Sequence, residues 1–168
     1  MKQFFIIAIL FAGLSVNAQI TTPAPSPTST ITQAIGLGEV TIEYSRPGMK
    51  DRAIFGADGL VPYGTKWRLG ANRATKISFS DDVKVNGNDL AAGTYAVLAT
   101  PTAANWEFEF HTHDTGSWSA YTDRTPVMKT TAKVNKMSHA MEPFASERDS
   151  LKPSWRNPFC TPSNTISL

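Results

Sequence analysis

The side chains with the clearest chemical potential lie in one long segment rich in glycine and proline, residues 46–72. Its arginines carry planar guanidinium groups, which suit the paired oxygens of carboxylate and phosphate groups. Its aromatic rings could stack on the face of a sugar, and its asparagine could bind a ligand or turn the backbone. The candidate binding residues of this segment are Arg46, Arg52, Tyr63, Trp67, Arg68 and Asn72.

These arginines have an alternative use inside the protein. A long connection needs polar anchors of its own, and Glu43, Asp51 and Asp58 are close in sequence. Pairing with these carboxylates would fasten the segment to its scaffold and leave no binding site. Aromatic and branched residues along 46–72 favour an ordered loop over a disordered one.

A second group with possible chemistry follows in the alternating run from Trp106 to His113. Alternation places Glu107, Glu109, His111 and His113 on one face of a strand and the aromatic residues on the other. Carboxylate and imidazole groups two residues apart can bind a divalent metal, so the candidate metal ligands are Glu109, His111 and His113. The alternative is a solvated strand face with no such role.

Several catalytic signatures are absent from the sequence. There is no Gly-x-Ser-x-Gly nucleophile motif and no glycine-rich phosphate loop, and the single Cys160 lies in a segment without a regular pattern. We therefore assign no catalytic residue and no cofactor. The sequence favours a non-catalytic role in which the 46–72 loop binds a small or extended ligand. That ligand would be a small molecule or a glycan. The alternatives are a hydrolase that uses loop residues or the Glu109/His111/His113 face, with or without a metal, and a structural envelope protein.

The elements around these candidates are strands. Apolar residues alternate with polar ones in short segments bounded by turn residues, which is typical of half-buried antiparallel strands. Asn86-Gly87 is the strongest hairpin signal, and Trp118–Tyr121 is a further candidate for pairing. The pattern predicts an all-β fold, an antiparallel β-sandwich or sandwich-like barrel with one long ordered loop over about 46–72. The alternating segments are residues 30–35, 40–45, 74–80, 83–85, 93–99, 106–111 and 127–134.

The ends of the chain differ from its centre. Residues 1–18 combine a basic start, an apolar run and small residues before Gln19, which predicts a secretory signal peptide cleaved after Ala18. Residues 19–29 form a Pro-rich linker, residues 30–141 the β domain, and residues 142–168 an irregular tail that is either divergent or frame-shifted. We expect a periplasmic or secreted protein with no membrane span. The formal net charge of +2 does not indicate a nucleic-acid partner, and the oligomeric state stays open.

Five short motifs together resemble a known family. They are Ile42–Gly48, Arg52–Gly56, Leu60–Gly64, Trp67–Asn72 and Ala92–Tyr95. In this order and spacing they are similar to the bacterial domain of unknown function 2911, over about residues 29–106 and more weakly to about 141. The resemblance implies an exported single-domain protein and no particular activity.

Overall fold

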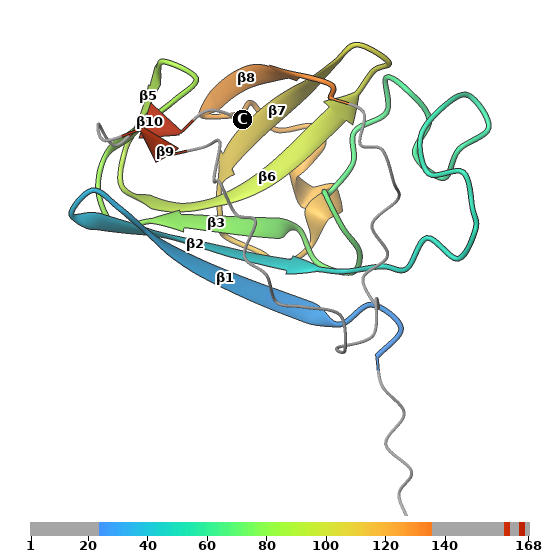
Figure 1. The fold of residues 1–168 in the computed structure, drawn as a ribbon, viewed down its shortest axis with the longest axis horizontal. Helices are drawn as coiled ribbons and strands as arrows, with labels where there is room; N and C mark the ends of the chain where they lie inside the picture. The colour runs from blue at the N-terminus through green and yellow to red at the C-terminus, as the bar shows by residue number, and fades with distance from the viewer. Residues whose placement is uncertain (1–23, 136–159, 162–164, 167–168) are drawn as a thin grey trace, which may run out of the picture.

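The computed structural model describes residues 24–135 and the short segments 160–161 and 165–166, and these residues form two β-sheets (Figure 1). All neighbouring strands of the larger sheet are antiparallel, and its outer strands do not meet, so it is not a closed barrel within the described residues. The predicted all-β, sandwich-like fold is confirmed. The larger sheet has the order β1 (Thr28–Ile35), β2 (Gly38–Ser45), β3 (Thr75–Phe79), β6 (Gly93–Pro101), β7 (Asn105–Thr112) and β8 (Met128–Lys133). The smaller has the order β5 (Asn88–Leu90), β4 (Val83–Val85), β10 (Thr165–Ile166) and β9 (Cys160–Thr161).

The two hairpins expected from turn residues are present. β1 and β2 pair along their whole length, and Gly36 begins their turn with φ of 60°. β4 and β5 pair across Asn86 and Gly87, whose φ angles of 49° and 82° are the positive values that a tight hairpin of this kind requires. Local sequence therefore fixes the register of both hairpins.

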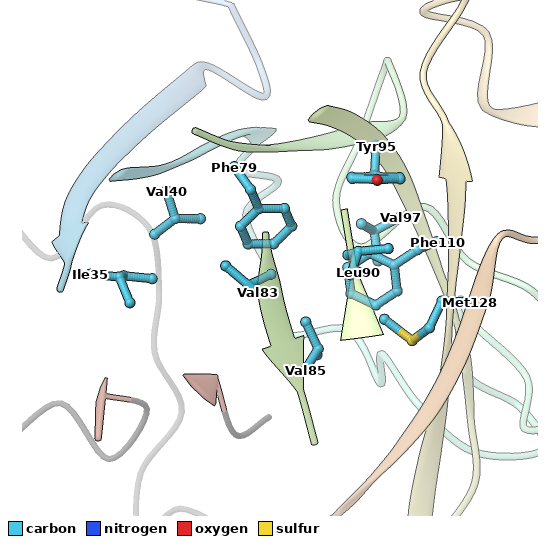
Figure 2. Packing of buried hydrophobic residues seen from close by; sticks show 10 residues of the cluster. All are labelled: Ile35, Val40, Phe79, Val83, Val85, Leu90, Tyr95, Val97, Phe110 and Met128. Atoms are coloured by element: carbon cyan, nitrogen blue, oxygen red, sulfur yellow. The ribbon is translucent and has the colours of Figure 1, made fainter. Parts of the chain in front are cut away.

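The main hydrophobic core lies between the two sheets, as Figure 2 shows. Strand alternation sends every second side chain of β2, β3, β6 and β7 into it, where those side chains meet the apolar residues of β4 and β5. Tyr95, Val97 and Phe110 are almost fully buried there. The buried members of this core are Ile35, Val40, Phe79, Val83, Val85, Leu90, Tyr95, Val97, Phe110 and Met128.

The opposite face of the larger sheet is covered as well. Ala96 and Leu98 of β6 pack there against Tyr121, which belongs to a short 3₁₀ helix, η1 (Trp118–Tyr121). The segment Trp118–Tyr121, a candidate for strand pairing in the sequence, is thus a helical turn. The Tyr121 hydroxyl accepts hydrogen bonds from the amides of Asp114 and Thr115 and donates one to the Thr115 carbonyl, at 3.1, 2.9 and 2.6 Å. These bonds fasten the segment over the sheet.

Several expectations from the sequence concern residues that the structure does not describe. The signal peptide at 1–18, the first part of the 19–29 linker and most of the 142–168 tail lie outside the described residues. Within the tail, β9 and β10 are two-residue strands, and β10 pairs in parallel with β4. No helix among the described residues is long and apolar enough to cross a membrane.

Candidate functional site

The predicted loop connects β2 to β3 and projects from one end of the sheets, at the right of Figure 1. The Arg46 amide donates to the Pro27 carbonyl at 2.9 Å, which extends the β1–β2 ladder by one residue. At the returning end, Trp67 and Ala99 exchange both backbone hydrogen bonds, at 2.7 and 2.8 Å. The loop is therefore joined to the larger sheet at both ends.

A pocket of about 590 Å³ lies under this loop. Its volume is within the usual range of small-molecule sites, about 300–1,000 Å³. Leu69, which borders the pocket, also packs against the main core, so the pocket adjoins the sandwich interior. Residues that line it include Tyr44, Arg46, Arg52, Phe55, Trp67 and Leu69.

Aromatic rings form one side of this site. Phe55 contacts Trp67 and Trp106 edge-on, with ring centroids 5.4 and 4.9 Å apart, and the two tryptophans lie 5.9 Å apart. Trp106 also approaches Phe108, which packs against the main core. Trp106 was not among the predicted site residues. The alternation of β7 indicated that Trp106 lies on its aromatic face. Nothing in the sequence indicated which loop residues would contact Trp106.

The Trp67–Ala99 pairing divides three successive residues between two sides of the sheet. Directly paired residues share a face, so Trp67 lies on the face of the main core while Lys66 and Arg68 lie on the other. The Arg68 guanidinium accordingly lies over Trp118, with Cζ 5.2 Å from the ring centroid, and its buried Nε has no hydrogen-bond partner. Arg68 borders the pocket, but its charged group is held against η1.

The other two loop arginines differ in their contacts. Arg52 donates from Nε to the Met49 carbonyl at 2.9 Å and from Nη2 to the Gly48 carbonyl at 2.8 Å, so it stabilises the loop's own turn. Within residues 24–135, no carboxylate forms an ion pair with Arg46, Arg52 or Arg68, and Glu43 instead pairs with Lys76 at 3.0 Å. Ion pairs of these arginines with Glu43, Asp51 or Asp58, the alternative that the sequence left open, therefore do not fasten this loop.

Two predicted binding residues lie apart from the pocket. The Tyr63 side chain is 47% exposed and does not line it. Asn72 adopts a positive φ of 59°, and its side-chain amide donates to the Ser26 carbonyl and the Ser45 hydroxyl at 3.2 and 3.3 Å. Asn72 thus turns the backbone and fixes the start of β3 to the β1–β2 hairpin.

The second candidate group is buried. Glu109 and His111 are each 2% exposed, because η1 and the neighbouring loop cover their face of β7. At Glu109 and His111, this face of β7 is buried, so the alternative of a solvated strand face is wrong for these two residues. Lys129 Nζ lies 2.6 Å from Glu109 Oε1 and Lys66 Nζ lies 2.8 Å from Oε2, although Oε2 receives no well-directed hydrogen bond. The two ammonium groups compensate the buried carboxylate.

The electrostatics of this buried cluster follow from those contacts. Burial alone would raise the pKa of Glu109, but Lys129 and Lys66 outweigh it and hold that pKa below its ordinary value. Burial lowers the pKa of His111. The Glu109 carboxylate, 3.5 Å from Nε2, raises that pKa but offsets only part of the effect of burial. Lys66 and Arg124 lower the pKa further. The lowered pKa favours the neutral form of His111, and neither ring nitrogen has a well-directed hydrogen-bond partner.

The predicted metal ligands do not form a ligand cluster in the described part of the chain. Within it, no group of three or more His, Cys, Asp or Glu side chains is placed to hold a metal ion. His113 lies just beyond the end of β7, where its amide donates to the Thr94 carbonyl at 3.0 Å. Both Glu109 oxygens already face lysine ammonium groups.

The fold and the pocket of the described residues define a class: a nearly all-β, two-sheet domain whose long ordered loop covers a pocket of small-molecule size. Within that class the chain belongs to the family described as "Protein of unknown function (DUF2911)", whose family model matches residues 26–157. The resemblance seen in the motifs is thereby confirmed, and the match extends beyond the range over which those motifs occur. No curated protein and no solved structure was found to match the chain.

Proposed function

We propose that this protein binds a small or extended ligand, without catalysis, in the pocket under the 46–72 loop. The observation that supports this most directly is an aromatic wall beside arginines that no carboxylate of the described residues neutralises. Exposed aromatic surface beside fixed donors is what a ligand pocket requires, whereas a purely structural loop would satisfy its charges internally. Hydrolysis at Glu109 and His111 has less support, because both side chains are buried and the carboxylate is held by two lysines.

The first test uses an uncharged aromatic probe, N-phenyl-1-naphthylamine, and follows its fluorescence together with that of the tryptophans. We expect saturable binding, and we expect Phe55→Ala to weaken it about tenfold because a ring contact of the pocket is lost. Phe55 packs edge-on against Trp67 and Trp106, so this change should also lower the melting temperature, and binding is compared at a temperature at which both proteins are folded. Leu37→Ala, in the fully exposed β1–β2 turn, is the matched control. Absence of saturable binding, or equal affinity in Phe55→Ala, would contradict the proposal.

We propose further that the protein acts outside the cytoplasm, in the periplasm or after secretion. The support is the N-terminal sequence, where a basic start and an apolar run precede Ala18. Full-length protein expressed in bacteria with an active secretion pathway should be recovered as a chain that begins at Gln19. The intact mass of the purified product measures this, and a product that retains Met1 would count against export.

A further inference from the structure

The pocket has a charge pattern that narrows its ligand, given the proposed binding function. Among the described residues, its lining includes Arg46, Arg52 and Arg68 and no aspartate or glutamate. The Arg68 charge is directed to the other side of the sheet, and the charges of Arg46 and Arg52 would attract a bound anion. The pocket therefore favours an anionic ligand over a neutral or cationic one.

Arg46 is the arginine best placed to meet that anion. Its backbone continues β2 through the hydrogen bond to Pro27, so strand alternation places Arg46 on the same face as Tyr44 and Ile42. Tyr44 lines the pocket and Ile42 packs against the main core. The Arg46 side chain is exposed and forms no ion pair with a carboxylate of the described residues. Arg46 thus lies at the rim of the pocket, on the same face of β2 as Tyr44, which lines the pocket.

The contacts of the other two arginines limit the number of acidic groups that a ligand of this pocket can carry. Arg52 already donates to the carbonyls of Gly48 and Met49, and the Arg68 guanidinium lies over Trp118 on the other side of the sheet. A polyphosphate would need several uncommitted cations, whereas the part of this site that the structure describes offers one complete guanidinium group. A guanidinium binds a single carboxylate or similar planar anion in a two-pronged arrangement.

We infer that the pocket takes an amphipathic anion, with an apolar or planar body against Phe55, Trp67 and Tyr44 and one acidic group at Arg46. The aromatic wall supplies contact area for the body, and the rim arginine fixes the orientation of the molecule. The acidic group stays near solvent, so its desolvation is only partial. This inference depends on the proposed binding function and adds the chemical class of the ligand.

The test compares two probes that share one ring system, 1-anilinonaphthalene-8-sulfonate and uncharged N-phenyl-1-naphthylamine. We expect the sulfonate to bind more tightly to the wild-type protein. We expect Arg46→Gln to weaken sulfonate binding about tenfold and to leave the uncharged probe unchanged. Arg46→Lys should retain part of the preference, since the charge stays but the planar fork is lost. Energy transfer from tryptophan to the bound probe gives a second readout of binding.

The control is Lys84→Gln, which removes the same charge from an exposed position of β4 in the smaller sheet, outside the pocket lining. It should affect neither probe. Equal affinity for the two probes, or sulfonate binding that is indifferent to Arg46→Gln, would overturn this inference alone. Failure of N-phenyl-1-naphthylamine to bind saturably would instead overturn the proposed function, so the two failures are distinguishable.

Discussion

Replacing both Lys66 and Lys129 with methionine is expected to lower the free energy of unfolding by about 3–5 kcal/mol at pH 7, the usual cost of leaving a buried charge without its partners. Glu109 is 2% exposed, and these two ammonium groups are the cations at its oxygens. Lys66 also donates to the Thr122 carbonyl at 2.8 Å, so its loss removes a tie to the covering segment. Without the lysines, folding would require Glu109 to take up a proton.

Urea denaturation measures this loss, and a third change separates charge from packing. Adding Glu109→Gln to the double variant removes the orphaned charge and should restore most of the lost stability. Lys76→Met is the control, because Lys76 and its partner Glu43 are both partly exposed to solvent, and surface pairs of this kind contribute at most about 1 kcal/mol. A double variant within 1 kcal/mol of wild type, by the same measure, would show that Glu109 is not held as a buried carboxylate.

His111 is expected to make the protein less stable in mild acid. Its pKa in the folded protein is lowered by burial, so the unfolded chain takes up this proton first as the pH falls below about 6.5. The stability associated with neutral His111 is thus fully present above that pH and is lost as the pH falls toward the folded-state pKa. For one proton, the slope of this loss has an upper limit of about 1.4 kcal/mol per pH unit.

The groups that face His111 define the experiment. They are Glu109 on its own strand, Lys66 from the loop, Tyr121 from η1 and Arg124 beyond it. The pKa of Glu109 is lowered, so the stability that it contributes is lost only as the pH falls from the ordinary glutamate pKa, about 4.3, toward its folded-state pKa, which is below this window. Unfolding free energies between pH 7 and 5 should therefore flatten in His111→Phe and keep their slope in His113→Gln. A wild-type protein whose stability is constant across this interval would refute the expectation.

The sequence predicted those parts of the fold that local pattern controls. Alternation located the strands, and Asn86-Gly87 located a hairpin because both residues accept positive φ. It also predicted that the 46–72 loop would be ordered, since its apolar residues needed a partner surface. That surface proved to include Trp106, more than thirty residues further along the chain.

The burial of Glu109 and His111 could not be predicted in the same way. A run of alternating charged residues looks the same whether its face meets water or another segment. The covering segment contains η1, and its Tyr121 is held by contacts with backbone groups rather than by a recognisable pattern. Lys129 reaches Glu109 through strand register, in which the two residues are directly paired across β7 and β8. Such long-range pairings decide whether a charge is solvated or buried.

The division of residues 66–68 between two sides of the sheet constrains how this protein can diverge. Trp67 borders the pocket, while Lys66 neutralises Glu109 and Arg68 lies over Trp118. An insertion or deletion that moved Trp67 and reshaped the pocket would also send its neighbours to the wrong faces. The shape and charge of the pocket can therefore change more readily through substitution at its outer residues, such as Phe55 and Arg46, than through changes in loop length around Trp67.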